Sequence, residues 1–304
     1  MPYSVNGKRA LITGGGSGIG LAFTTLLLSK GCNVLIVDLA LRPEAQAVVD
    51  AHSTTTPRAV FHKTDVTVWS DLQSAFDRCN QEFGGLDIVG PGAGVFEPPW
   101  SNFWYPPGHA LSKDAPDSNA YKQLEINVTH PIRATQMAIA AFLNPANSED
   151  KASAQNPKRV VLTSSIAGQA FGLAFPIYFA SKHAISGFTR SLGDLEGSLG
   201  IRVNAVAPGG VYTPMYTTEP HKGRLVDFEK DMWLTAEEVA IQMMRLLEDD
   251  DLPGGTILEV TKEPRVVPAW NNPGPKPEHT TISTMDVVMD EVYNELAKPG
   301  WGKV

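Results

Sequence analysis

The sequence predicts an α/β protein: a single doubly wound, Rossmann-type parallel sheet of about seven strands, with helices on both faces and a C-terminal extension. Three observations predict it. Apolar strand-like runs alternate with helix-like segments, a glycine-rich turn follows the first run, and 304 residues that are 42% hydrophobic suffice for one large core. We divide the chain into a main domain, residues 1–263, and the extension, residues 264–304.

The expected strands are short apolar runs, and the expected helices are the longer periodic segments between them. The strands are 9–12, 33–37, 59–63, 86–89, 158–163, 201–206 and 256–260. The helices are 18–30, 43–51, 68–83, 119–143, 178–199 and 235–248. Ligands of such sheets lie beyond the carboxyl ends of the strands, and residues 14–20, Asp38, Asp65, Ser165 and Pro208 each follow a strand end.

The sequence TGGGSGIG at residues 13–20 follows the first strand and opens the first helix. This order of strand, glycine turn and helix is the context that a dinucleotide-binding loop requires. The glycines let the backbone approach a pyrophosphate, and the free N–H groups at the helix N-terminus favour an anion. A glycine run alone is more often a flexible turn, so the flanking elements carry this prediction.

Asp38 ends the second strand, 18 residues beyond Gly20. A carboxylate at this place accepts hydrogen bonds from the adenosine ribose and repels a 2′-phosphate, which predicts NAD rather than NADP as the cofactor. A solvated acid in a strand-to-helix loop is the alternative, and Arg42 nearby could accommodate a phosphate.

Tyr178 and Lys182, in the sequence YFASK, lie four residues apart and therefore on one face of a helix. Lowering the pKa of a Tyr from about 10 by about 3 units takes about 4 kcal/mol. Two unit charges about 4 Å apart supply that at an effective dielectric of about 20. The pair predicts a tyrosine general base, although an isolated pair at this spacing usually marks a solvated helix face.

The motifs resemble those of the short-chain dehydrogenase/reductase family. They are TGGGSGIG, Asp65-Val66, Asn127, Ser164-Ser165, YFASK and PGGVYT at residues 208–213, with similar sequence over about residues 5–262. The resemblance implies an NAD-dependent oxidoreductase that interconverts a secondary alcohol and a ketone. It also implies four catalytic residues. Ser165 would hydrogen-bond the reacting oxygen, Tyr178 would take the hydroxyl proton, and the Asn127 backbone would hold a water that relays it from Lys182.

The resemblance also implies a cofactor site without a metal. Its residues would be Gly14, Gly16, Ser17, Gly18, Ile19, Gly20, Asp38, Asp65, Val66, Gly92, Ala93, Gly94, Tyr178, Lys182, Pro208, Gly209, Val211 and Thr213. One stretch departs from the family pattern, because Pro91 and Gly92 replace both asparagines of the usual NNAG sequence. We therefore expect that side-chain ties between the sheet and its neighbours are lost.

Two aromatic-rich segments, residues 95–119 and 211–234, are expected to set substrate specificity. The first is too long for an ordinary connection and forms either a wall over a large apolar substrate or an Ω-like loop packed on itself. The second corresponds to the mobile lid of the family. The candidate substrate contacts are Phe96, Trp100, Trp104, Gln169, Tyr212, Met215, Tyr216 and Trp233.

These segments predict a bulky, mainly lipophilic substrate, such as a terpenoid, polyketide, steroid or fatty-acid derivative of secondary metabolism. The sequence leaves the direction open, because an NADH-dependent ketone reductase would use the same residues. A nucleotide-sensing protein without turnover is the alternative from another class, motivated by the missing asparagines. The intact Ser165, Tyr178 and Lys182 argue against it.

The extension contains a Pro- and Gly-rich connector and an amphipathic helix over residues 283–296, which caps the active site or contacts a partner in a homodimer or homotetramer. A net charge of −8 without a Lys/Arg cluster argues against nucleic acid or an anionic membrane as partner. The chain shows neither a membrane-spanning run nor a signal peptide, and its two cysteines form no disulfide framework, so we expect a cytoplasmic protein.

Overall fold

One eight-stranded sheet runs through the part of the chain that the computed structural model describes, residues 2–218, 229–269 and 285–302. The strand order is β3-β2-β1-β4-β5-β6-β7-β8. Strands β1 to β7 pair in parallel, and β8 pairs with β7 in the antiparallel direction. The predicted fold class is confirmed, with β8 as an unforeseen edge strand.

The observed elements lie close to the expected ranges. The strands are β1 (Arg9–Thr13), β2 (Asn33–Asp38), β3 (Ala59–Lys63), β4 (Ile88–Pro91), β5 (Lys158–Thr163), β6 (Ile201–Pro208), β7 (Ile257–Val260) and β8 (Arg265–Val266). The main helices are α1 (Gly18–Ser29), α2 (Pro43–His52), α3 (Trp69–Phe83), α5 (His130–Leu143), α6 (Pro176–Ser191), α9 (Ala236–Glu248) and α10 (Met285–Leu296). The shorter helical segments are α4 (Lys122–Leu124), the π-helical η1 (Glu125–Thr129), η2 (Ser148–Asp150), η3 (Ile166–Gly168), α7 (Leu195–Leu199) and α8 (Pro214–Thr217).

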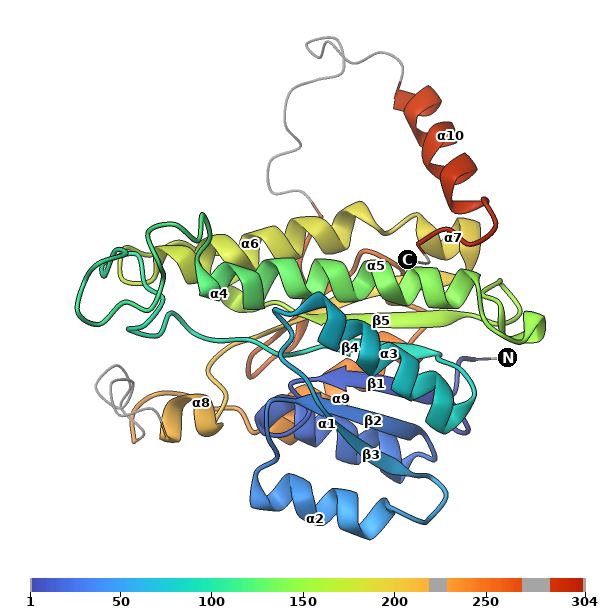
Figure 1. Ribbon diagram of the computed structural model, residues 1–304, viewed down its shortest axis with the longest axis horizontal. Helices are drawn as coiled ribbons and strands as arrows, with labels where there is room; N and C mark the ends of the chain where they lie inside the picture. The colour runs from blue at the N-terminus through green and yellow to red at the C-terminus, as the bar shows by residue number, and fades with distance from the viewer. Residues whose placement is uncertain (1, 219–228, 270–284, 303–304) are drawn as a thin grey trace.

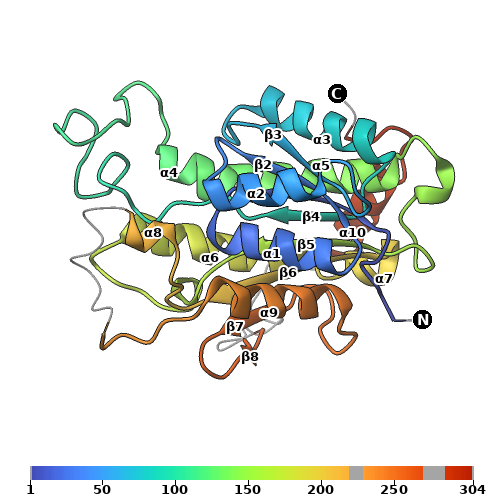
Figure 2. The same cartoon turned by 90° about the horizontal axis from the view of Figure 1, so that it is seen from below.

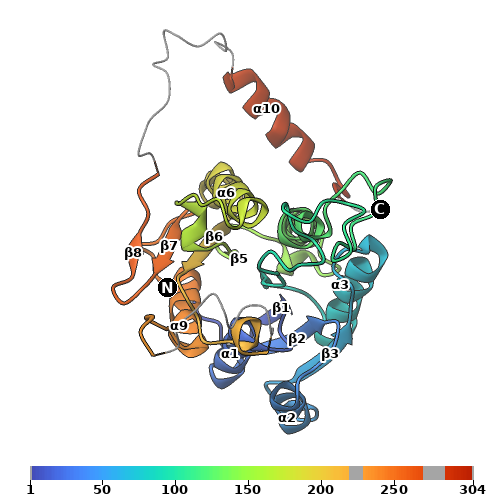
Figure 3. The ribbon, with the colours of Figure 1, turned by 90° about the vertical axis from the view of Figure 1, so that its left-hand side faces the viewer.

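Helices cover the sheet in two layers, with α1, α2 and α9 on one face and α3, α5 and α6 on the other (Figure 3). Successive side chains of a strand point to opposite faces, so each strand supplies both layers. In β1, for example, Ala10 and Ile12 belong to the core beneath α1 and α9, whereas Leu11 belongs to the core beneath α3 and α5. Burial on both faces explains the nearly continuous apolar runs in the sequence.

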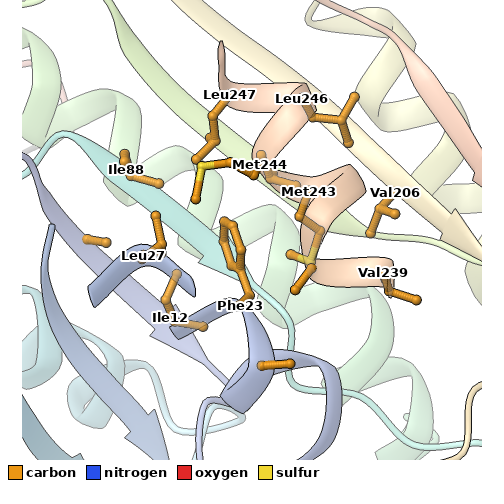
Figure 4. Close-up of a cluster of buried hydrophobic side chains, with 14 of the residues drawn as sticks. Ile12, Phe23, Leu27, Ile88, Val206, Val239, Met243, Met244, Leu246 and Leu247 are labelled. Carbon is orange, nitrogen blue, oxygen red and sulfur yellow. The ribbon is translucent and has the colours of Figure 1, made fainter. Parts of the chain in front are cut away.

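Helices α1 and α9 pack against each other although they lie far apart in the sequence. Figure 4 shows Phe23 of α1 among Ile12, Leu27, Met243 and Met244. Phe23 is fully buried, and burial of such an aromatic side chain stabilises a protein by about 1.5–3 kcal/mol. This packing holds the N-terminus of α1, and with it the glycine-rich turn, against the carboxyl end of β1.

Two long expected helices are interrupted in the structure. The segment expected at 119–143 begins at Lys122 and contains the π-helical turn η1 before α5. The segment expected at 178–199 starts two residues earlier, at Pro176, and is divided into α6 and α7. The first interruption has a clear cause in Pro131, which has no N–H with which to continue the regular hydrogen-bond pattern.

The carboxyl ends of the strands point to the left in Figures 1 and 2, toward helix α8 and the loop formed by residues 95–119. Of the predicted lid at 211–234, the structure describes residues 211–218 and 229–234. This end of the sheet therefore carries both segments that the sequence predicts to contact substrate.

Within the extension, β8 pairs with β7 at the edge of the sheet, whereas α10 and the residues after it lie toward the opposite end from the cavity (Figure 1). The residues that follow α10 bind to the end of α5. The side chain of Asn144 accepts a hydrogen bond from the Gly300 N–H at 2.9 Å and donates one to the Trp301 carbonyl at 2.9 Å. Trp301 and Leu296 pack against the core beneath α5. The expected connector around Pro273 lies outside the described residues, and both the domain boundary at 263 and a role in a dimer stay predictions.

None of the helices in the described ranges combines the length and the apolar character needed to cross a lipid bilayer.

Candidate active site

A cavity of about 310 Å³ lies at the carboxyl ends of the strands. It brings together segments from the whole length of the sheet, as expected for a doubly wound fold. Its lining includes these residues predicted from the sequence: Gly14, Ser17, Gly18, Ile19, Gly20, Asp38, Asp65, Val66, Gly92, Ala93, Gly94, Ser165, Tyr178, Lys182, Pro208, Gly209, Val211, Thr213, Met215 and Tyr216.

The glycine-rich turn forms one wall of this cavity, and side chains would not fit there. A Cβ atom on Gly14, whose φ is +71°, would lie 2.7 Å from the Ala93 backbone nitrogen. A Cβ on Gly20 would lie 2.2 Å from the Gly14 carbonyl oxygen. The glycines of the turn therefore leave backbone N–H groups accessible at the N-terminus of α1, which suits a pyrophosphate group. Gly16 is outside the lining, and its N–H donates a hydrogen bond to Asp38 at 2.9 Å.

The two acidic residues at the strand ends have different surroundings. Burial raises the pKa of Asp38, although its carboxylate accepts hydrogen bonds from the Gly16 and Leu39 N–H groups. Burial also acts to raise the pKa of Asp65, but hydrogen bonds from the Thr67 side chain and backbone outweigh it and leave that pKa lowered. Asp38 thus ties the strand end to the glycine turn at the place where a ribose is expected.

Tyr178 and Ser165 both line the cavity, and their side chains are hydrogen-bonded to each other. Tyr178 stands in the first turn of α6, and Ser165 precedes the short segment η3 at the end of β5. The Ser165 hydroxyl also donates to the Pro208 carbonyl at 3.3 Å and accepts from the Ala167 N–H at 3.2 Å. The two hydroxyl groups therefore present a fixed pair of hydrogen-bonding atoms to a ligand.

Lys182 lies beside this pair, with its Nζ atom 5.5 Å from the centre of the Tyr178 ring and 2.9 Å from the Thr163 carbonyl oxygen. Burial lowers the pKa of Lys182 to about 8. Burial raises the pKa of Tyr178, and the hydrogen bond with Ser165 only partly opposes this. We expected Lys182 to lower the pKa of Tyr178. With the protein's own groups alone that pKa is raised instead, because removal of the phenol from water is the larger effect.

Asn127 lies within the π-helical turn η1 and is buried, although it does not line the cavity. Its side-chain oxygen accepts from the Val95 N–H at 2.9 Å, and its amide group donates to the Val95 carbonyl at 2.8 Å. The donor for its backbone carbonyl in a regular helix would be the N–H of residue 131, which is a proline. This carbonyl therefore lacks its regular helical partner.

Two buried residues near the site were missed by the sequence analysis. His130 is fully buried and contacts Thr13 and the Ile126 carbonyl. Glu97 is 2% exposed and contacts the backbone of Tyr178. A histidine inside an apolar helical run and an acid flanked by Phe96 and Pro98 were visible signals, but their partners are distant in sequence.

The predicted aromatic residues divide into two groups. Phe96 packs edge-on against Tyr178, with ring centres 4.6 Å apart, and also lies 5.9 Å from Tyr216. Trp233 packs against Tyr216 at 5.2 Å and against Tyr212 at 6.2 Å. These four residues form a continuous aromatic wall beside Tyr178, in which Tyr216 lines the cavity directly.

The remaining candidates lie away from the cavity lining. The Trp104 indole N–H donates to the Leu173 carbonyl at 3.0 Å, and about half of its side chain is exposed. The Trp100 carbonyl accepts from the Lys113 N–H at 2.8 Å, within the loop itself. Gln169 donates to the Ser186 hydroxyl at 3.4 Å. The structure does not bring these three side chains to the aromatic wall.

The chain matches the short chain dehydrogenase family over residues 8–223. The 15-hydroxyprostaglandin dehydrogenase (NAD(+)) of Bos taurus is 31% identical over 271 residues, covering 84% of this chain and 92% of that protein. The hydroxynaphthalene reductase-like protein Arp2 of Metarhizium majus is 33% identical over 218 residues, covering 71% of this chain and 72% of that protein. The resemblance that the sequence analysis identified is confirmed.

Solved structures agree with this relationship. A short chain dehydrogenase from Burkholderia cenocepacia J2315 in complex with NADP superimposes with a TM-score of 0.65 at 28% identity, covering 85% of this chain and 98% of that chain. A 3-ketoacyl-(acyl-carrier-protein) reductase from Brucella melitensis complexed with NADH gives a TM-score of 0.66 at 22% identity, which indicates a shared fold.

Proposed function

This chain belongs to the short chain dehydrogenase family, and from that premise we propose that it is an NAD-dependent oxidoreductase that interconverts a secondary alcohol and a ketone. The single observation that carries the proposal is the convergence of Ser165, Tyr178 and Lys182 on the cavity that the glycine turn and Asp38 also line. Reactive hydroxyl groups and a dinucleotide cradle in one cavity are what hydride transfer to a nicotinamide requires.

The residues of the cradle fit such a cofactor. The backbone of residues 14–20 would hold the pyrophosphate, and Asp38 would accept hydrogen bonds from the ribose. Lys182 would bond the second ribose, and Pro208 and Thr213 would lie beside the nicotinamide. When bound, the oxidised cofactor supplies the hydride acceptor.

The protein's own residues would manage the proton. Ser165 and Tyr178 hydrogen-bond the carbinol oxygen, and Tyr178 accepts its proton as general base. Because burial raises the pKa of Tyr178, the phenolate needs further positive charge close by, and we expect the rate of alcohol oxidation to rise with pH. Lys182, and a water held by the Asn127 carbonyl, would then pass the proton toward solvent.

A bulky, mainly lipophilic substrate suits the aromatic wall of Phe96, Tyr212, Tyr216 and Trp233. Wide apolar ligands gain most from such walls, because each buried aromatic contact contributes about 0.5–1.5 kcal/mol beyond the area that it buries. The opposite direction, reduction of a ketone with NADH, is a second candidate, favoured by the similarity to a hydroxynaphthalene reductase-like protein.

The test is NADH formation, followed by absorbance, with a panel of secondary alcohols from small and polar to large and apolar. The matching ketones are assayed with NADH. We expect turnover of the large apolar members, NAD in preference to NADP, and no turnover by Tyr178→Phe despite intact NAD binding. Preference for small polar alcohols would contradict the substrate class, and NAD binding without any turnover would favour a sensor.

A further inference from the structure

Helix α6, which carries Tyr178 and Lys182, begins without a side-chain cap of its own. Phe175 occupies the N-cap position and makes no capping hydrogen bond, and Pro176 follows as the first helical residue. The first N–H groups of a helix have no partner within the helix, and leaving them unpaired inside a protein is costly. Their partner must therefore come from another part of the chain.

That partner is Glu97, which lies 81 residues before Tyr178 in the loop of residues 95–119. Its Oε2 atom accepts the Tyr178 backbone N–H at 2.8 Å, and the Ile177 N–H also bonds to its carboxylate. Its Oε1 atom accepts the Phe103 N–H at 3.3 Å. A carboxylate at this place caps the helix and also interacts favourably with the positive end of the helix dipole.

The backbone of Glu97 indicates that this contact is specifically maintained. Its φ of +32° is unusual for a residue with a side chain. Such conformations persist only where the surroundings hold them, and they concentrate at functional sites. Burial also raises the pKa of Glu97, so the protein keeps an acid where an apolar side chain would avoid the cost of desolvation.

The preceding residue, Phe96, links the same loop to the Tyr178 side chain. Phe96 packs on the Tyr178 ring, whereas Glu97 holds the Tyr178 backbone. The loop itself is fixed by Asp114, which accepts from the Ser101 hydroxyl at 2.9 Å and from the Lys122 N–H at 2.9 Å. The loop thus contacts Tyr178 twice and is anchored to the start of α4.

We propose that Glu97 is a positioning residue for catalysis, which holds the first turn of α6 so that the Tyr178 hydroxyl stays beside Ser165 and faces the substrate. The loop of residues 95–119 is then part of the catalytic framework as well as a substrate wall. This inference rests on the proposed function of Tyr178 as general base. It extends that function to a residue outside the motifs of the family.

The test compares Glu97→Gln and Glu97→Ala with the wild-type protein. Gln keeps the size and one acceptor oxygen, so we expect kcat to fall about tenfold, whereas Ala removes both acceptors and should lower kcat about a hundredfold, as small misplacements of reacting groups do. The dissociation constant for NAD should change by less than about twofold, because the glycine turn lies on another element.

Glu238→Gln is the matched control, because Glu238 completes a capping box with Thr235 at the start of α9, away from Tyr178. We expect this variant to keep the wild-type kcat. The kinetic isotope effect on kcat, measured with the alcohol deuterated at the carbinol carbon, should rise for the Glu97 variants alone, because a misplaced base slows the chemical step. An unchanged isotope effect would overturn the proposal. It would also be overturned if kcat fell only in proportion to the fraction of protein molecules that no longer bind NAD.

Amide hydrogen exchange separates this proposal from the proposed function. Glu97→Gln should increase exchange at the Ile177 and Tyr178 amides at least about tenfold and leave the rest of α6 protected, whether or not a substrate is found. Unchanged exchange at these amides would refute the capping role. A wild-type protein without turnover, but with the expected change in exchange, would refute only the catalytic role.

Discussion

The Thr13 hydroxyl and the His130 imidazole share a buried hydrogen bond of 3.0 Å between Oγ1 and Nε2. Thr13 Oγ1 also accepts the N–H groups of Gly92 at 3.0 Å and Ala93 at 3.3 Å, so its only proton is donated to His130. The other ring nitrogen, Nδ1, therefore carries the proton and donates to the Ile126 carbonyl at 3.1 Å. His130 thus provides a tie between the sheet and α5 where the replacement of both NNAG asparagines predicted a loss.

Removal of this tie should destabilise the protein. His130→Ala leaves a cavity, and it leaves the Thr13 hydroxyl and the Ile126 carbonyl without their partner, which together cost about 3 kcal/mol. Urea unfolding followed by circular dichroism measures this free energy. His109→Ala, at an exposed histidine of the loop, is the control and should change stability by less than about 0.5 kcal/mol. Equal stabilities of the two variants would contradict the role of His130.

The same histidine should make stability depend on pH. Burial lowers the pKa of His130 from 6.5 to about 4, so the unfolded chain binds the proton first as the pH falls. The contribution to stability is complete above pH 6.5 and is lost between about pH 6.5 and 4, amounting to about 3 kcal/mol at about 1.4 kcal/mol per unit. Unfolding free energies of the wild type and His130→Gln should converge over this range. Parallel curves would exclude this titration.

Pro131 should be important for the proton relay, because it leaves the Asn127 carbonyl without its regular helical donor. Pro131→Ala supplies that N–H, so the carbonyl becomes occupied and the π-helical turn becomes regular. We expect kcat to fall about tenfold with unchanged or higher stability, since proline inside a helix costs up to about 3 kcal/mol. Steady-state kinetics and thermal unfolding measure both effects. A variant with wild-type kcat would show that this carbonyl plays no part in the relay.

The sequence predicted the fold well because its signals are local. Each strand is an apolar run buried on both faces, and the glycine turn at residues 13–20 marks the first change from strand to helix. The lining residues of the cavity were predictable for a related reason. Residues that follow strand ends must meet at one edge of a parallel sheet, so Asp38, Ser165 and Pro208 converge without any knowledge of distant contacts.

Features that depend on distant pairs could not be predicted in this way. Glu97 contacts Tyr178, 81 residues away, and His130 contacts Thr13, 117 residues away. The π-helical turn around Asn127 follows from Pro131, which lacks an N–H, and a hydrophobic period of 3.6 residues does not reveal this. The pKa of Tyr178 was misjudged because the sequence shows a nearby amine but not the burial that outweighs it.

Asp38 should determine the choice of cofactor. Asp38→Ser removes a charged acceptor for the ribose hydroxyls and the repulsion of a 2′-phosphate, and hydrogen bonds to charged groups contribute about 1.5–3 kcal/mol. We expect kcat/KM for NAD to fall about tenfold to a hundredfold and that for NADP to rise. Asp50→Ser, at an exposed acid of α2, is the control and should keep the wild-type preference. Steady-state assays with both cofactors give the ratio, and an unchanged ratio would assign the discrimination to another residue.

Tyr216 should contribute binding energy for the substrate rather than for the cofactor or the chemical step. It lines the cavity and packs against Phe96 and Trp233, so Tyr216→Ala opens the aromatic wall beside Tyr178. Loss of an aromatic side chain that a bound substrate would bury removes about 1.5–3 kcal/mol of apolar contact, which raises KM for a bulky apolar alcohol about tenfold to a hundredfold. Tyr216→Phe keeps the ring and should keep KM within about threefold, which separates packing from hydrogen bonding. A comparable loss of kcat/KM for a small polar alcohol would show instead that Tyr216 supports the reaction centre and not the substrate wall.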